Sequence, residues 1–122
     1  MCSKIIKNDV EVNVVTVYNP PENHKDVTLF MDNIQNEDIV DAGNTVILGD
    51  FNVDLFKDTS SIKRFKEHTS SIQQHITMPT QREGGLFDHI YTNQCVRDRM
   101  LSSGTFDLYY SDHSGVFIML EA

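Results

Sequence analysis

Apolar and polar residues alternate along the first part of the chain with the two-residue period of a β-strand. Residues 3–6 and 10–18 are predicted to be strands around the polar turn Lys7-Asn8-Asp9, a composition that is typical of a hairpin, and it is the second of them that alternates. The second segment alternates and then becomes continuously apolar, which indicates a buried strand. Asn19-Pro20-Pro21 follows it, and we expect the strand to end there because proline has no N–H to donate to a ladder.

The apolar spacing then changes to the three- and four-residue steps of a helix, which we predict over residues 25–40. Its apolar stripe is Val27, Phe30, Met31, Ile34 and Ile39. Residues 42–44 close this segment, and a short buried strand is predicted at 45–48. A second helix is predicted from about residue 60 to 74, with Thr59 or Ser60 as its N-cap. Its inward residues are Ile62, Phe65 and Ile72.

The last third of the chain has the pattern of strands separated by loops. Residues 78–85 contain a proline and two adjacent glycines, which indicate a loop. Strands are predicted at 86–92, near 101–106 and at 115–120, with a tyrosine-rich loop at 109–110. Because strands alternate with helices and then dominate the end, the pattern predicts a mixed-sheet α/β domain.

Composition narrows the class of protein. A length of 122 residues leaves room for one domain with one core. The net charge of −8 argues against affinity based on broad phosphate neutralisation, but it leaves room for an enzyme that meets nucleic acid at a small, cation-assisted site. No membrane span or signal peptide is recognised, and Cys2 and Cys95 match no metal-site or disulfide pattern. We therefore expect an intracellular protein, cytoplasmic or nuclear, or else a fragment that has lost its own start.

The first candidate site residues are Asp50 and Asn52, which follow the predicted strand at 45–48. If the segment is still extended there, both side chains project to the same side of the sheet. The aspartate can then take a proton from water or ligate a metal, while the amide donates to a phosphate oxygen. An Asx turn, in which Asp50 only caps a loop, explains the pair equally well.

Asp88 lies inside an apolar, strand-like segment, where an unpaired carboxylate is costly. A hydrogen bond to a histidine would satisfy it and raise the basicity of that histidine, so either Asp88 or Asp112 is expected to fix His113. The alternative for Asp88 is an edge strand with its side chain on the solvent-exposed face. The alternative for Asp112 and His113 is a polar turn before the last strand. His89 points to the opposite face and is predicted to be structural.

Tyr18, Thr80 and Arg82 are weaker candidates for substrate contacts. A tyrosine at the end of a strand can direct its hydroxyl to a phosphate, although core or rim tyrosines are the commoner case. Thr80 and Arg82 lie in the loop before Asp88, where a solvated loop is an equal alternative.

Taken in order, these residues resemble the endonuclease/exonuclease/phosphatase superfamily, the DNase-I-like phosphodiesterases and phosphatases. The likeness is greatest to the endonuclease domains of non-LTR retrotransposons. The collinear segments are Val17-Tyr18-Asn19-Pro20-Pro21, Ile47-Leu48-Gly49-Asp50-Phe51-Asn52-Val53-Asp54, Pro79-Thr80-Gln81-Arg82, Leu86-Phe87-Asp88-His89-Ile90-Tyr91-Thr92-Asn93 and Tyr110-Ser111-Asp112-His113. The resemblance implies a four-layer α/β sandwich with two facing mixed sheets, and phosphoester hydrolysis with Mg²⁺ or Mn²⁺.

The resemblance also implies a role for each acidic motif. Asp50 would position or activate the attacking water, and Asn52 would stabilise the phosphate. Asp88 would orient the histidine, His113 would face the scissile phosphate, and Asp112 would serve the metal region.

The loop and strand-end residues would contact the substrate. Tyr18 would meet the phosphate, and Thr80 and Arg82 would touch the substrate from their loop. Gln81 stands between these two residues, where retrotransposon relatives usually have threonine and arginine adjacent.

The front of the chain departs from the superfamily pattern. Members begin with strands that bear an asparagine and then a metal-ligating glutamate, both well upstream of the tyrosine. Only seventeen residues precede Tyr18, and Glu11 lies too close to serve. The resemblance therefore implies that residues 1–122 form a single partial domain. It would be the C-terminal half to two-thirds of the sandwich, with one mixed, largely antiparallel sheet and without the main metal carboxylate.

The leading hypothesis is thus a metal-dependent phosphoesterase-fold protein, of the Mg-dependent endonuclease type, whose complete domain hydrolyses nucleic-acid phosphodiesters, with DNA as the substrate. The alternative is a non-catalytic remnant or interaction module that keeps the half-sandwich and binds a partner through its open face. A phosphomonoesterase stays open within the enzyme class. Activity of this chain alone is also left open, because a missing metal ligand costs orders of magnitude in affinity or rate.

A sheet without its opposing layer would leave a large apolar face exposed, and such patches favour association. We expect the isolated chain to be poorly soluble, to dimerise, or to require an N-terminal partner segment. Size-exclusion chromatography with light scattering measures this. A compact, well-behaved monomer would contradict the expectation.

Overall fold

The computed structural model describes residues 2–36 and 43–121. Its elements in chain order are β1 (Cys2–Lys7), β2 (Val10–Tyr18), α1 (His24–Asn36), β3 (Asn44–Asp50), α2 (Ser60–His68), β4 (Gln73–Gln74), β5 (Asp88–Thr92), α3 (Gln94–Arg97), β6 (Met100–Phe106) and β7 (Gly115–Leu120). No helix within the described ranges is long and apolar enough to cross a bilayer.

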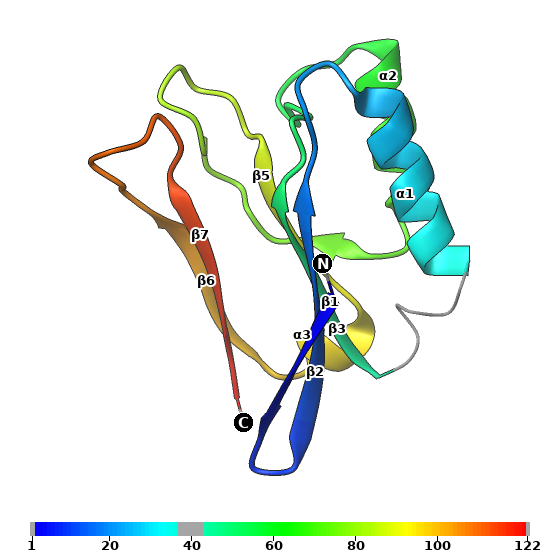
Figure 1. Ribbon diagram of the computed structural model, residues 1–122, viewed down its shortest axis with the longest axis vertical. Helices are drawn as coiled ribbons and strands as arrows, with labels where there is room; N and C mark the ends of the chain where they lie inside the picture. Colours follow the sequence, from blue (N-terminus) through cyan, green and yellow to red (C-terminus); the bar gives the residue numbers. More distant parts are fainter. Residues whose placement is uncertain (1, 37–42, 122) are drawn as a thin grey trace.

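A five-stranded sheet lies between two covering layers (Figure 1). Its strand order is β1-β2-β3-β5-β4, with α1 and α2 on one face and the two-stranded β6–β7 sheet on the other. Strands β2 and β3 run parallel, whereas the remaining neighbours are antiparallel. The prediction of a mixed, largely antiparallel sheet in an α/β domain is confirmed.

Alternation along the central strands divides their apolar side chains between two cores. Val15 of β2 and Ile47 of β3 belong to the core that α1 and α2 cover, together with Met31 and Phe65. That face is closed tightly, because Met31 and Phe65 are fully buried. The helices therefore fix the orientation of the sheet below them.

The opposite face of the same strands packs against the second sheet. Val46 and Leu48 of β3 and Ile90 of β5 share a core with Val116 and Ile118 of β7. The expectation of one sheet's worth of strands is therefore wrong, because β6 and β7 form a separate layer over the central sheet (Figure 1).

Part of this inter-sheet face stays open. A groove of about 290 Å³ is lined mainly by apolar residues, among them Val12, Val14, Val46, Leu48, Ile118 and Leu120. The apolar surface expected from the sequence is thus present, although β6–β7 covers some of it. Self-association through this face stays a prediction.

The second helix ends earlier than predicted, whereas the predicted end of the first cannot be compared with the described residues. α1 is described to Asn36, and the predicted continuation to residue 40, with Ile39, lies outside the described residues. α2 begins with the predicted cap, because the Thr59 side chain accepts from the Ile62 N–H. It ends at His68 because the hydroxyl of Thr69 turns back to the Phe65 carbonyl at 3.0 Å and competes with the helix.

The chain around β5 is also less regular than predicted. Residues 73–74 are not helical but form β4 against β5. β5 itself begins at Asp88, because Leu86 and Phe87 accept hydrogen bonds from Leu55 and Phe51 of the loop after β3. The short α3, which Asn93 caps, had no predicted counterpart.

Gly49 permits the close approach of β2 and β3 immediately before Asp50. Its φ is +144°, and a Cβ there would lie 1.9 Å from the Val17 carbonyl oxygen. We expect Gly49→Ala to lower the free energy of unfolding by at least about 2 kcal/mol, measured by urea denaturation.

Gly43→Ala is the matched control, because Gly43 also has a positive φ, +109°, but open space around the Cβ position. It should cost less, since it adds only backbone strain. Equal losses in the two variants would show that the collision with Val17 is unimportant.

Candidate functional site

Three candidate residues form a row across neighbouring strands. Tyr18 of β2 is opposite Asp50 of β3, and Asp50 is opposite Asp88 of β5. Side chains two residues apart share a face, so Asp50 lies on the face of Val46 and Leu48, toward β6–β7. The row therefore stands where these strands end or begin, at the edge of the inter-sheet core.

His113 reaches this row from the loop before β7. Its Nδ1 lies 2.7 Å from Oδ2 of Asp88, in a pair whose side chains are 28% and 13% exposed. One ligand atom each from Asp50, Asp88 and His113 lies within 4.8 Å of the others. Of the two carboxylates considered from the sequence, Asp88 is the one that bonds His113.

The charges in this cluster shift two pKa values. Burial raises the pKa of Asp50, and the charges of Asp88 and Asp112 raise it further. The hydrogen bond from the Asn52 N–H and the charge of His113 act in the opposite direction, but the net effect is a raised pKa. Burial acts to lower the pKa of His113, but the hydrogen bond and charge of Asp88, with Asp50 and Asp112, raise it above its usual value. The cluster thus favours an imidazolium between carboxylates.

The segment after β3 is not extended, which corrects the expectation that Asp50 and Asn52 project side by side. Asn52 has a φ of +50°, and its N–H donates to Oδ1 of Asp50 at 3.0 Å. Its side-chain amide donates to the Asn19 carbonyl. The Asx turn is therefore the local structure. Asn52 keeps one amide hydrogen beyond the bond to Asn19.

Asn19 is a positioning residue that sequence reasoning missed. It is 5% exposed, its N–H donates to the Asp50 carbonyl at 2.9 Å, and its side-chain amide donates to the Phe51 carbonyl at 2.9 Å. Its side-chain oxygen accepts from Asn23 at 3.2 Å. Buried amides need such partners, but the sequence showed only an asparagine before two prolines, which indicated a strand end.

Thr80 does not have the expected exposure for a substrate contact. Its side chain is fully buried, and Oγ1 accepts from the backbone N–H groups of Phe87 at 2.9 Å and Asp88 at 3.0 Å. The hydroxyl therefore fixes the start of β5, and with it Asp88. Thr80 therefore positions Asp88, and its contact with substrate stays a prediction.

Arg82 and Asp112 hold the neighbouring loop. The Arg82 N–H donates to the Asp112 carbonyl at 2.7 Å, and Nη2 donates to the Ser111 carbonyl at 3.3 Å. Arg82 is exposed and can be reached by a ligand, and its contact with substrate stays a prediction. The carboxylate of Asp112 is exposed and outside the group of three ligand atoms, and its metal role stays a prediction.

The donor chemistry fits a hard divalent cation. Asp50 and Asp88 offer carboxylate oxygens, which Mg²⁺ and Mn²⁺ prefer. Mg²⁺ keeps several waters and commonly needs only one or two protein carboxylates beside substrate phosphates. His113 is less suited as a ligand through Nδ1, because that atom is bonded to Asp88.

His89 lies on the other face of β5 and is fully buried, as predicted for a structural residue. Its ring stacks on Phe51, with centroids 4.8 Å apart. Burial lowers its pKa to about 4, so it is neutral at pH 7. Nε2 then donates to the Val53 carbonyl at 2.9 Å, and Nδ1 accepts from the Tyr91 hydroxyl at 2.9 Å.

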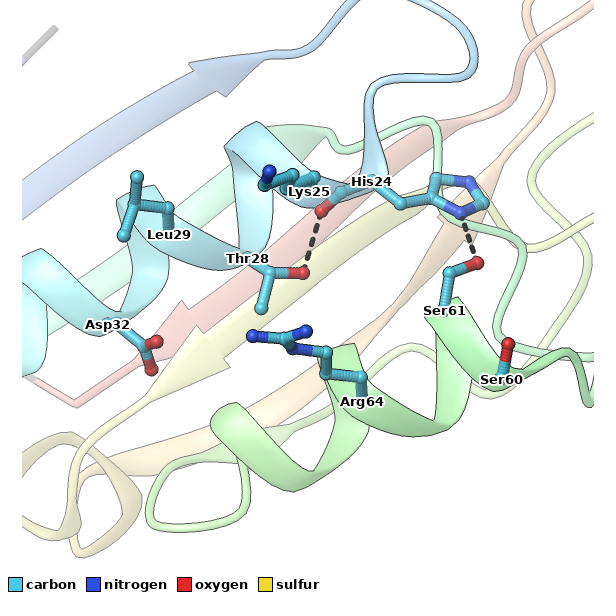
Figure 2. A pocket seen from close by; sticks show the side chains of 8 residues that line it. All are labelled: His24, Lys25, Thr28, Leu29, Asp32, Ser60, Ser61 and Arg64. Carbon is cyan, nitrogen blue, oxygen red and sulfur yellow. Dashed lines mark hydrogen bonds between the residues drawn. The ribbon is translucent and has the colours of Figure 1, made fainter.

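A separate hollow of about 420 Å³ lies between α1 and α2 (Figure 2). Its lining residues are His24, Lys25, Thr28, Leu29, Asp32, Ser60, Ser61 and Arg64. Nδ1 of His24 and Oγ of Ser61 join its two walls at 2.8 Å. It shares no residue with the Asp50 cluster, so we do not assign it to that site.

No family model and no curated protein matches this chain, but solved structures do. The endonuclease domain of TRAS1, a telomere-specific non-LTR retrotransposon, has a TM-score of 0.82 at 16% identity, over 98% of this chain and 60% of that one. The 3′ phosphatase NExo from Neisseria, bound to product DNA hairpin, has a TM-score of 0.69 at 16% identity, over 99% of this chain and 65% of that one.

A third similar structure is a beta toxin variant from Staphylococcus aureus with bound magnesium ions. Its TM-score is 0.57 at 16% identity, over 98% of this chain and 53% of that one. The chain therefore has the endonuclease/exonuclease/phosphatase, or DNase-I-like, fold. It spans less than two thirds of the length of each of these three structures.

The bond between Asp88 and His113 predicts a pH dependence. Because the folded-state pKa of His113 is raised, its contribution to stability is present below the usual value of 6.5 and is lost as the pH rises through the raised value. We expect Asp88→Asn to lower the pKa of His113, measured by NMR titration of the imidazole in EDTA.

Asp112→Asn is the control, because its charge acts on His113 without a side-chain hydrogen bond. It should lower the same pKa by less. A larger effect from Asp112→Asn than from Asp88→Asn would contradict the assigned pairing.

Proposed function

We propose that this chain carries the acid–base residues of a metal-dependent phosphodiesterase, and that its complete domain is an endonuclease that cleaves DNA. The observation that supports this best is the Asp50–Asp88 pair, opposite each other in the sheet and joined to His113 by the 2.7 Å bond from Asp88. Like charges placed opposite each other destabilise a sheet, so a half-buried pair of this kind favours a chemical role.

Asp50 is the candidate base in this proposal. One of its oxygens is held by the Asn52 N–H at 3.0 Å, which fixes the carboxylate while the other oxygen remains for water or a cation. Its raised pKa brings the carboxylate nearer to the range in which a base works. Asn52 would donate its remaining amide hydrogen to a phosphate oxygen.

His113 is the candidate for stabilising charge on the phosphate. Asp88 holds Nδ1, so the imidazolium presents Nε2–H as its remaining donor. The raised pKa keeps this donor charged nearer to neutral pH. Tyr18, 73% exposed and opposite Asp50 in the sheet, would offer its hydroxyl to the same phosphate.

A divalent cation completes this chemistry. Asp50 and Asp88 would hold Mg²⁺ or Mn²⁺, with Asp112 in the surrounding region. Bound there, the cation would stabilise negative charge on the phosphate and on the leaving oxygen. The bound magnesium of the beta toxin structure supports this choice of metal.

DNA as the substrate draws support from two neighbours of the same fold, the TRAS1 endonuclease domain and NExo with its product DNA hairpin. An intracellular location is part of the proposal, in agreement with Cys2 and Cys95, which form no disulfide.

The apolar groove between the sheets supports a second candidate, an interaction module that binds a partner there.

The proposal predicts relaxation of supercoiled plasmid in the presence of Mg²⁺ or Mn²⁺. Asp50→Ala and His113→Ala should each lower the rate at least about 100-fold, because each removes a group that acts on the reacting phosphate or water. Gel analysis of plasmid nicking measures the rate.

Asp58→Ala and His24→Ala are matched controls, since both residues lie outside the cluster. They should cleave like the unchanged chain. No cleavage, together with a calorimetric titration that shows no metal binding, would favour the interaction module instead.

A further inference from the structure

Two tyrosines next to the site have no role in the proposal above. Tyr109 is 98% exposed and Tyr110 is 88% exposed, in the loop between β6 and β7. Both stand within four residues of His113. Adjacent aromatic rings left in solvent beside a reactive cluster indicate a contact surface rather than a core.

The tyrosines adjoin a hollow that contains the reactive imidazole. Its volume is about 290 Å³, and Tyr109, Arg82, Asp112 and His113 are among its lining residues. A ligand whose phosphate reaches His113 would therefore pass the ring of Tyr109. Tyr110 is the next residue and is also exposed, although it is not among the lining residues of the hollow.

The loop that presents the rings is held in place. The Ser111 N–H donates to the Leu108 carbonyl at 3.4 Å, and the His113 N–H donates to Oγ of Ser111 at 3.1 Å. Arg82 bonds the carbonyls of Ser111 and Asp112 from the neighbouring loop. Binding would thus require little ordering of the backbone.

Charge limits how this surface can hold a polyanion. Asp107 and Asp112 line the hollow, and Arg82 and His113 are the cationic side chains among its lining residues. The chain as a whole carries −8. Attraction to phosphates is therefore weak here, and affinity must come from contacts that do not depend on charge.

We propose that Tyr109 and Tyr110 stack on unpaired nucleobases of the strand whose phosphate lies at His113. Stacking on tyrosine requires a free base face, and in a duplex those faces are covered by neighbouring base pairs. The site thus takes single-stranded or unpaired nucleotides as its substrate class. The inference rests on the proposed function, because it assumes that the phosphate is that of a nucleic acid.

The test compares oligonucleotides with and without free base faces, and the abasic strand matches dT12 in charge. A fluorescein-labelled dT12 strand, an abasic strand of the same length and a blunt duplex are titrated with the chain in EDTA, which prevents cleavage. We expect dT12 to bind roughly tenfold or more tightly than the other two. Because the chain has no tryptophan, dT12 should also quench the tyrosine fluorescence directly.

Variants separate stacking from hydrogen bonding. Replacing both tyrosines by alanine should remove the preference for dT12, whereas replacing both by phenylalanine should keep it, since the ring remains. Leu101→Ala, at another exposed apolar residue, is the control and should bind dT12 normally. Loss in the phenylalanine variant as large as in the alanine variant would overturn stacking.

Two further results would overturn the inference. One is equal or undetectable binding of dT12 and the abasic strand. The other is a change of oligomeric state in the alanine variant without a change in dT12 binding, which would identify a protein contact.

Plasmid cleavage is assayed separately. Cleavage without a base preference refutes only this inference, and a base preference without cleavage refutes only the proposed chemistry.

Discussion

The repulsion between Asp50 and Asp88 is the constraint on which the rest of the site depends. Strand register puts the two carboxylates opposite each other. Partial burial leaves less water around Asp50 to screen the repulsion between them. His113 offsets the repulsion by bonding Asp88 and placing a cation beside both. The same arrangement explains why the pKa of His113 is raised. Burial is the main cause of the raised pKa of Asp50, and the charge of Asp88 adds to it.

The surrounding structure holds that unfavourable pair in place through backbone contacts rather than further charges. Thr80 fixes the N–H groups at the start of β5, and Asn19 fixes the carbonyls of Asp50 and Phe51 at the end of β3. Gly49 lets β2 approach β3 closely enough for this register. The helical core on the far face of the sheet anchors these contacts, because Phe51 stacks there on His89.

The sequence predicted the features that depend on local patterns. Composition and alternation located the hairpin of β1 and β2, and an apolar run located β7. The acidic residue in an apolar segment indicated one of the two candidate partners of His113, and it is the one that bonds it. It did not predict what tertiary hydrogen bonds decide. The Thr69 hydroxyl bond at the end of α2 and the turn at Asn52 are local, but hydrophobic periodicity does not reveal them. The buried role of Asn19 and the contact of the Asn52 amide depend on partners more than thirty residues away. Thr80 takes its role from the backbone of the next strand. The resemblance predicted the fold correctly. It did not predict that β6 and β7 form a second sheet, separate from the five-stranded one.

In the proposed function, the acidic character of the chain would become part of its selectivity. A basic face would hold any duplex by its phosphates, whatever its sequence or pairing. Here carboxylates crowd the cluster, so a nucleic-acid strand would gain little from approaching with its backbone alone. Cations held by the carboxylates and the tyrosine rings beside them would supply attraction only at the cluster itself. Such a surface would favour strands that can present both a phosphate to His113 and a free base to the adjoining loop.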